Sequence, residues 1–310
     1  MSAAPLEVLP DAERGSFDGG ERAIHALFER PESELRPEIE AILATAPDWL
    51  TQYHLSPQRR LLLSWYGFPR DATVLEIGAG CGALTGLLCD RAAHVVANEK
   101  FLVRAEALAR RLADRANLRV VAGGIEHVAL DEPADVVVCV GVWEYAGVFL
   151  EADDERRFTD PFRRFLDIVR ALVRPGGRLL LAIENKLGLQ YLAGAEEDHG
   201  GHGILASVES YPDFAGVRTF SRAEIVRLLA EAGFGASTFH LPFPDYKLPR
   251  VVVREDALHD LGVTPAALRG LVAWHRPRLP LVNEHMLALA LHDADVLAAF
   301  ANSFLVEARG

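Results

Sequence analysis

The sequence predicts a doubly wound α/β fold with a mostly parallel sheet, and two observations carry this prediction. Short continuous apolar runs alternate with amphipathic segments over residues 71–255, a pattern typical of strands that are buried on both faces of a parallel sheet. A glycine-rich turn at residues 78–82 directly follows the first of these runs, as at the first strand–helix junction of nucleotide-binding folds. The chain therefore divides into an N-terminal arm and helical cap (1–70), the α/β core (71–255) and a C-terminal helical extension (256–310).

The segment before the core has no strong strand pattern. Residues 1–20 lack periodicity and predict a loose arm, and residues 20–46 show the spacing of short amphipathic helices. A further helix is expected after Ser56, because Ser-Pro is a favourable N-cap and first-turn pair. These elements together form the expected cap.

The core elements follow in a regular order. We expect strands at 73–77, 94–97, 118–122, 136–140 and 178–184, and helices at 83–92, 102–116, 161–173 and 222–234. The residues from 237 to 253 predict two short strands around a proline-rich turn. Residues 186–217 are too long for an ordinary connection and are interpreted as an active-site loop or lid.

Composition excludes several classes of protein. Half of the 310 residues are apolar and a quarter are charged, which is a globular composition. The formal charge of −12 disfavours a general nucleic-acid binder, which needs a basic face. No apolar run approaches the roughly 20 residues that cross a bilayer, and no signal peptide is apparent. With three cysteines that form no CxxC pair, we expect a cytoplasmic protein without membrane or nucleic-acid partners.

The turn after the first core strand has the composition of a cofactor site. Gly78, Gly80 and Gly82 allow a tight turn and the close approach of a ligand to the backbone. Glu76 lies inside an apolar strand, where a carboxylate is costly unless it has a partner. Glu99 follows Gly78 by twenty-one residues and ends the second strand, where nucleotide-binding folds place the acid that binds a ribose diol.

The glycines alone leave the identity of the cofactor open. The spacing Gly78-x-Gly80-x-x-Ala83 also fits a dinucleotide fingerprint, so an NAD(P)-dependent oxidoreductase is one alternative. Glu76 is badly placed for a pyrophosphate but suits a cationic ligand. The long N-terminal cap could close over a small cofactor. Both features favour S-adenosyl-L-methionine.

Four segments together resemble class I S-adenosylmethionine-dependent methyltransferases, which have a Rossmann-like core. They are VLEIGAGCGALT, the acid that follows VVAN, ADVVVCVGVWEYA and LVRPGGRLLLAIEN. The resemblance covers residues 71–255. It implies that Glu76 and the three glycines wrap the methionine part and that Glu99 holds the ribose. It also implies that Gly141 and Val142, with the residues up to Glu144, line the methyl-transfer site.

The sequence departs from the family pattern after the third core strand. The family often has an acidic residue there, close to the adenine amine, whereas this chain has Ala122-Gly123-Gly124-Ile125. The adenine contact is therefore expected from the backbone of Gly124 and Ile125 or from Glu126.

A narrower resemblance connects YHLSPQR, IENKLGLQYLAGAEEDH, PFPDYKLP and ANSFL with methyltransferase domains of bacterial glycan and O-antigen gene clusters. It implies a sugar-containing acceptor, and it places Tyr53 and Arg59 near the cofactor. An ordinary helix cap explains the first of these segments equally well.

Candidate catalytic residues lie on the loops that follow the strands. A hydroxyl acceptor needs a base, and His199 is the first choice because Asp198 adjoins it and two glycines follow. Asp245, Tyr246 and Lys247 lie on a proline-framed turn that is either a surface turn or a rim for the acceptor. The other candidates on these loops are Asn185, Glu197 and His202. His199 and His202 beside Asp198 do not have a recognised metal-ligand spacing, so no metal is expected.

Together these observations predict methyl transfer from S-adenosylmethionine to an oxygen or nitrogen of a sugar-containing or natural-product small molecule. The alternatives are the oxidoreductase and a non-catalytic module that binds S-adenosylmethionine. The sequence leaves open whether the C-terminal helices form a homo-oligomer. It contains no heptad repeat that would support such an interface.

Overall fold

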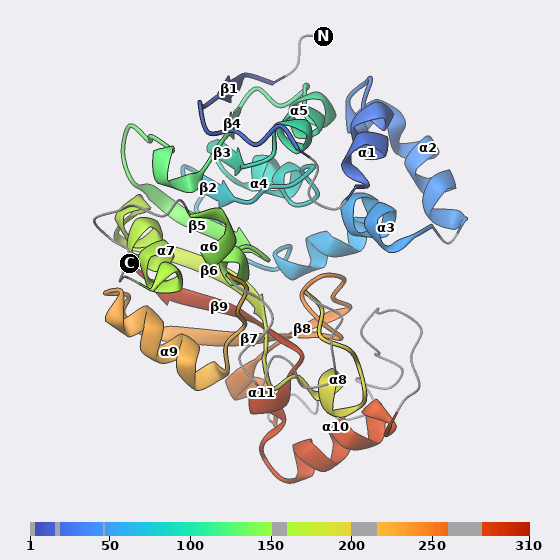
Figure 1. Ribbon diagram of the computed structural model, residues 1–310, viewed down its shortest axis with the longest axis vertical. Coiled ribbons are helices and arrows are strands. Elements are labelled where there is room, and N and C mark those ends of the chain that lie inside the picture. The colour runs from blue at the N-terminus through green and yellow to red at the C-terminus, as the bar shows by residue number, and fades with distance from the viewer. Residues whose placement is uncertain (1–3, 16–18, 46, 151–159, 200–215, 260–280) are drawn as a thin grey trace. The chain divides into compact units, whose positions relative to one another are not determined.

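The computed structural model describes residues 4–15, 19–45, 47–150, 160–199, 216–259 and 281–310 (Figure 1). The chain divides into two compact units. The first contains Met1–Cys139 with Ala171–Arg178, and the second contains Val140–Arg170 with Leu179–Gly310. Among the described residues, no helix is both long enough and apolar enough to cross a lipid bilayer.

The first unit is built on five parallel strands. They are β1 (Leu6–Val8), β2 (Thr73–Ile77), β3 (His94–Glu99), β4 (Leu118–Ala122) and β5 (Ala134–Val140). Their order is β1-β4-β3-β2-β5, and each neighbouring pair runs in parallel. The chain moves outward from β2 to β3 and β4, and then returns to the other side of β2 with β5. β2 is therefore the point at which the strand order reverses, where open α/β sheets bind their ligands.

The register of β2 explains its apolar sequence. Glu76 lies opposite Ala97 of β3 on one side and opposite Val138 of β5 on the other. Val74 and Leu75 are fully buried, because helices cover both faces of such a sheet. The prediction of a doubly wound, mostly parallel sheet is confirmed.

In the described part of the first unit, five α-helices accompany these strands. The cap contains α1 (Glu21–Leu27), α2 (Glu32–Ala44) and α3 (Trp49–Leu55), and the core adds α4 (Thr85–Arg91) and α5 (Leu102–Arg111) (Figure 1). Two expectations for the N-terminal segment need correction. The arm is not loose throughout, because Leu6–Val8 pairs with β4 and continues the sheet. The helix expected after Ser56 is a 3₁₀ helix, η1 (Pro57–Leu62).

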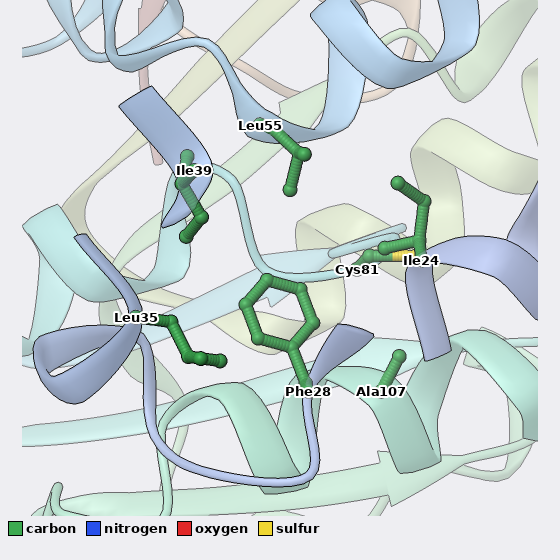
Figure 2. Packing of buried hydrophobic residues seen from close by; sticks show 7 residues of the cluster. All are labelled: Ile24, Phe28, Leu35, Ile39, Leu55, Cys81 and Ala107. Carbon is green, nitrogen blue, oxygen red and sulfur yellow. The ribbon is translucent and has the colours of Figure 1, made fainter. Parts of the chain in front are cut away.

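A buried hydrophobic cluster joins the cap to the glycine turn (Figure 2). Five of its seven residues belong to the N-terminal segment; the cluster consists of Ile24, Phe28, Leu35, Ile39, Leu55, Cys81 and Ala107. Cys81 lies in the glycine turn itself, and Ala107 lies in α5. Packing of the cap therefore supports the position of the turn.

The second unit contains the end of β6 (Val173–Glu184), which continues from the first unit, and an antiparallel group. β7 (Ser237–Phe243) pairs antiparallel with β8 (Val251–Arg254) and with β9 (Ser303–Arg309). The two strands predicted around the proline-rich turn are therefore present as β7 and β8. The helices are α6 (Ala146–Phe149), α7 (Pro161–Leu172), α8 (Leu189–Leu192), α9 (Arg222–Glu231), α10 (Glu284–Asp293) and α11 (Leu297–Phe300).

The C-terminal segment differs from the helical extension that the sequence predicts. Its described part contains α10 and α11, but the last seven residues before Gly310 form β9 beside β7. Phe304, Leu305 and Val306 are fully buried, which explains their unbroken apolar run. Residues 260–280 of this extension, and residues 200–215 of the expected lid with His202, lie outside the described residues.

Candidate active site

The glycine turn after β2 has the backbone conformation that its sequence predicts. Gly78, Gly80 and Gly82 have φ angles of 68°, 56° and 81°, a left-handed region that residues with a side chain rarely occupy. A Cβ atom on Gly82 would lie 3.1 Å from Leu108 Cγ, so close packing against α5 also requires a glycine. The turn lies at the reversal point of the strand order.

Glu76 has the partner that a buried carboxylate requires. Its side chain is buried, and its Oε2 accepts a hydrogen bond of 2.6 Å from the hydroxyl of Thr85, the first residue of α4. Burial raises the pKa of Glu76 to about 7, against the opposing effects of Thr85 and Arg59. A cationic group at this carboxylate would stabilise its ionised form.

Glu99 connects the glycine turn with the start of α5. Its two oxygens accept hydrogen bonds from the backbone of Gly80 at 2.8 Å and of Phe101 at 2.9 Å. Burial raises the pKa of Glu99, and Arg104 opposes this effect. Because each carboxylate oxygen has two lone pairs, these bonds leave acceptor capacity for the hydroxyls of a ribose.

The segment that contains Tyr53 and Arg59 is connected to the glycine turn. The Arg59 guanidinium lies 3.7 Å from the centre of the Tyr53 ring, a cation–π contact. The buried Arg111 donates hydrogen bonds to the carbonyls of His54, at 2.8 Å, and Cys81, at 3.0 Å. These bonds bridge the end of α3 and the glycine turn.

A carboxylate from the N-terminal arm lies beside the Gly123-Gly124 loop after β4. The backbone N–H of Gly124 donates to Asp11 Oδ2 at 2.8 Å. The other oxygen, Oδ1, is buried without a hydrogen-bond partner within the described part of the chain. Ile125 is buried and begins the 3₁₀ helix η2 (Ile125–His127). Sequence reasoning missed Asp11, because no local pattern connects residues that are 113 positions apart.

In the second unit, Gly141 and Val142 follow the end of β5. Gly141 has a φ of 70°, and its N–H donates to the carbonyl of Ala182 at 3.0 Å. A Cβ atom at this position would lie 2.7 Å from Tyr246 Oη, so the buried tyrosine requires a glycine here. Val142 precedes the 3₁₀ helix η3 (Trp143–Tyr145).

The turn that contains Tyr246 and Lys247 is part of a buried polar network. The Tyr246 hydroxyl donates to Glu184 Oε1 at 3.0 Å. Lys247 Nζ lies 2.6 Å from the same oxygen and 2.6 Å from Asp198 Oδ2. Burial disfavours the Lys247 ammonium, but Asp198 and Glu184 overcome this effect and raise its pKa well above the usual value. Lys247 therefore pairs with carboxylates of its own chain.

Asp245 stabilises this turn locally. Its side chain is buried, and its Oδ1 accepts hydrogen bonds from the backbone of Lys247 at 2.8 Å and of Leu248 at 3.2 Å. Such bonds to residues two and three positions later are typical of aspartate in turns. Asn185 likewise stabilises the local backbone, because its Nδ2 donates hydrogen bonds to the carbonyls of Ala299 and Ala301.

His199 is held by Glu197, whereas Asp198, its expected partner, pairs with Lys247. His199 Nδ1 lies 2.6 Å from Glu197 Oε1, and its backbone N–H donates to Glu197 Oε2 at 2.7 Å. Burial disfavours the imidazolium, but the bond to Glu197 and the charge of Glu184 outweigh it and raise the pKa of His199 to about 9. The ring therefore carries a proton at neutral pH, unlike the unperturbed histidine that the sequence suggests as a base.

Glu144 and Glu184 lie close to His199. Each of the three residues offers a ligand atom, and these atoms all lie within 4.8 Å of one another. Burial, followed by the charge of Glu184, raises the pKa of Glu144 to about 8. Burial of Glu184 is outweighed by Lys247, which lowers its pKa. Sequence reasoning did not single out Glu184, although an acid at the end of an apolar strand gives the same signal as Glu76.

The sequence comparisons point to one class of enzyme. Residues 75–181 match the profile of a family described as a methyltransferase domain. The matched segment begins in β2, ends in β6 and includes Glu76, the glycine turn and Glu99. No curated protein sequence matches the chain.

Solved structures of methyltransferases are similar to this chain. One is a chain of the complex between the Haloferax volcanii Trm112 methyltransferase activator and a protein described as a methyltransferase, with a TM-score of 0.50 and 16% identity over 88% of this chain and 97% of that chain. An S-adenosylmethionine-dependent methyltransferase of Thermotoga maritima has a TM-score of 0.45 and 14% identity, covering 92% of this chain and 99% of its own. The Haemonchus contortus phosphoethanolamine N-methyltransferase 1 has a TM-score of 0.48 and 14% identity, covering 90% of this chain and 48% of its own.

The fold is that of Rossmann-like methyltransferases. The match to the methyltransferase domain identifies the protein as an enzyme, an S-adenosylmethionine-dependent methyltransferase. Its cofactor is S-adenosyl-L-methionine.

Proposed function

We propose that the enzyme transfers the methyl group to an oxygen or nitrogen of a small molecule, and that this acceptor contains a sugar. The observation that carries the proposal is the pair of buried carboxylates Glu144 and Glu184, which lie together with His199. Hydroxyl and amine acceptors both carry protons that a carboxylate binds or removes. An acceptor without O–H or N–H groups would leave Glu144 Oε2 and Glu184 Oε2 without a hydrogen-bond donor from the described residues, at a considerable cost in free energy.

The proposal of a sugar-containing acceptor is supported by the location of the motifs that resemble glycan-cluster methyltransferases, because three of them contribute to the polar network of the second unit. Three of these motifs supply the polar network of the second unit, with Glu184 and His199 from one, Tyr246 from another and Ser303 from the third. Ser303 Oγ accepts a hydrogen bond of 2.9 Å from the backbone of Tyr246. A polyhydroxylated acceptor suits a network that alternates donors and acceptors.

For the cofactor, we propose the roles that the family resemblance implies. Glu76 meets the cationic amino group or sulfonium, the backbone of Gly78, Gly80 and Gly82 wraps the methionine part, and Glu99 binds the ribose hydroxyls. This assignment is supported by the left-handed glycines and by the burial of both acids.

Further cofactor contacts are proposed from the cap and the arm, and Tyr53 and Arg59 contribute from the cap, as their link to the glycine turn supports. For Gly141 and Val142 we propose the role at the methyl-transfer site that the family resemblance implies. The backbone of Gly124 and Ile125 contacts the adenine. Asp11, whose Oδ1 is buried beside this loop, accepts a hydrogen bond from the adenine amine.

The enzyme has to position the acceptor in line with the methyl group. It does not have to activate this methyl group, because the sulfonium already makes it reactive. We propose that Glu184 and, in its ionised form, Glu144 receive the hydrogen bonds of the reacting O–H or N–H group; the pKa of about 8 leaves Glu144 mostly protonated at neutral pH. His199, protonated at neutral pH, orients the acceptor and serves as a base only after it has lost this proton. Asp198, Asp245 and Tyr246 act as positioning residues through Lys247 and Glu184.

The test is a search for the acceptor with S-adenosylmethionine labelled in its methyl group. The purified enzyme is incubated with nucleotide sugars, free sugars, hydroxylated natural products and primary amines, and the products are identified by mass spectrometry. Saturable transfer to a hydroxyl or amine of a sugar-containing molecule is expected. Labelled methyl found only on protein or nucleic acid would contradict the proposal, as would transfer to carbon.

A further inference from the structure

Three buried side chains of the second unit are arranged around one point. Glu144 belongs to η3, Glu184 ends β6, and His199 follows α8. Glu144 is 1% exposed, Glu184 is 2% exposed, and the side chain of His199 is 3% exposed. Their ligand atoms lie within 4.8 Å of one another. Atoms that coordinate one first-row metal ion at about 2.1 Å are about 3 to 4.2 Å apart, so small side-chain movements suffice for coordination.

Two carboxylate oxygens in this group have no hydrogen-bond partner among the residues that the structure describes. They are Glu144 Oε2 and Glu184 Oε2, and both are shielded from solvent. The other oxygen of Glu184 is occupied by Tyr246 and Lys247. A buried carboxylate oxygen without a donor or a cation is costly, so these two atoms point to a ligand of positive charge.

The histidine is held in the way that metal-binding histidines are held. Its Nδ1 lies 2.6 Å from Glu197 Oε1, and metal-bound histidines characteristically donate one ring N–H to a carboxylate. This contact orients the ring and makes the opposite nitrogen, Nε2, a stronger ligand. The edge of the ring also packs against Tyr145, with ring centres 5.1 Å apart.

Four carboxylates gather in this part of the second unit. Glu197 and Asp198 add two to Glu144 and Glu184, and the described ion pairs of this group involve His199 and Lys247. Lys247 is engaged with Asp198 and with the far oxygen of Glu184.

We propose that Glu144, Glu184 and His199 bind one divalent transition-metal ion, Zn²⁺ or Mn²⁺. Two carboxylate oxygens and one imidazole suit these ions, whereas Mg²⁺ and Ca²⁺ prefer ligand sets made of oxygen alone. Because coordination needs the neutral ring, the ion would displace the Nε2 proton of His199 into solvent. It would also lower the pKa of an acceptor hydroxyl. Metal binding itself does not depend on the identity of the acceptor.

The proposal is tested on the full-length protein after treatment with a chelator. Calorimetric titration with ZnCl₂ and, separately, with MnCl₂ should show one equivalent of at least one ion bound, and elemental analysis after gel filtration should give the same stoichiometry. Glu144→Gln and Glu184→Gln, which keep the side-chain shape, should each weaken binding at least tenfold. Glu197→Gln should weaken it less, because this residue acts through the histidine.

A matched control comes from the neighbouring acid Glu196, which is exposed. Glu196→Gln should bind metal as the parent does, and retained S-adenosylhomocysteine binding shows that each variant is folded. The proposal is overturned if the folded parent binds neither ion stoichiometrically, or if Glu144→Gln and Glu184→Gln bind as tightly as Glu196→Gln. Methyl transfer by a parent that binds no metal would reject this site and leave the proposed function intact.

Discussion

Four buried glutamates dominate both candidate sites, and each meets the cost of burial differently. Glu76 accepts a hydroxyl hydrogen bond, Glu99 accepts two backbone N–H groups, and Glu184 pairs with Lys247. Glu144 has no hydrogen bond to its Oε2 from any described residue. Because a buried carboxylate oxygen without a donor is costly, Glu144 Oε2, together with Glu184 Oε2, marks the place that we propose for an external ligand.

The ribose role of Glu99 predicts a defect in cofactor binding. Glu99→Ala should weaken S-adenosylhomocysteine binding by about 1–3 kcal/mol, the usual cost of losing hydrogen bonds to a charged group. Calorimetry measures this change. Glu106→Ala, on a partly exposed side chain of α5, is the matched control and should bind normally. An unchanged affinity in folded Glu99→Ala would remove the ribose assignment.

The raised pKa of Glu76 predicts a specific pH dependence of stability. Between pH 4.5 and about 7 the folded protein keeps a proton on Glu76 that the unfolded chain has released, so stability falls as pH rises through this range. Glu76→Gln removes this titration. The difference in unfolding free energy between parent and variant, measured in urea without ligand, should shift against the parent by about 3 kcal/mol from pH 4.5 to pH 8. A difference that does not change with pH would contradict the burial argument.

At the scale of elements, local signals predicted the strands and helices of the core but not the two added strands. The apolar runs of β2 to β5 and the glycine turn are local features, and the structure has them where the sequence places them. β1 has three residues and is a strand because it pairs with β4, more than a hundred residues later in the chain. β9 likewise depends on β7. Pairing between distant segments leaves no periodic signal in one sequence.

The proposed contact between Asp11 of the N-terminal arm and the adenine predicts a selective loss of cofactor affinity. If Asp11 accepts a hydrogen bond from the adenine amine, Asp11→Ala should lower the affinity for S-adenosylhomocysteine about tenfold, or about 1.4 kcal/mol. S-Inosylhomocysteine carries an oxygen in place of this amine, so its affinity should not fall. Calorimetry with both ligands makes the comparison. Equal losses for the two ligands would indicate a purely structural role of the arm.

The cap should owe much of its stability to the cluster in Figure 2. Phe28 is fully buried there and also lies 5.0 Å from the Arg111 guanidinium. Phe28→Ala should therefore lower the free energy of unfolding by about 3–5 kcal/mol. Leu61→Ala, at a residue that is 42% exposed, should change it by less than about 0.5 kcal/mol. Similar effects of the two substitutions in urea unfolding would show that the cap does not pack as described.

For the molecule as a whole, the cofactor site was more predictable than the acceptor site. The glycine turn, Glu76 and Glu99 lie on consecutive elements, so their spacing alone brings them together. The polar network of the second unit collects Glu144, Glu184, His199 and Lys247 from four separate segments. His199 and Asp198 were predicted as candidates, but their partners depend on tertiary contacts that no spacing rule contains.

The most direct test of the account is a kinetic comparison of the parent with Glu144→Gln on the identified acceptor. Calorimetry with S-adenosylhomocysteine is performed on both proteins. The account predicts that Glu144→Gln lowers kcat by about 10²–10⁴-fold, the usual contribution of a proton-handling group, while S-adenosylhomocysteine affinity stays unchanged. Turnover of Glu144→Gln within about twofold of the parent, with the same product, would contradict the assignment of the acceptor site to the buried carboxylates.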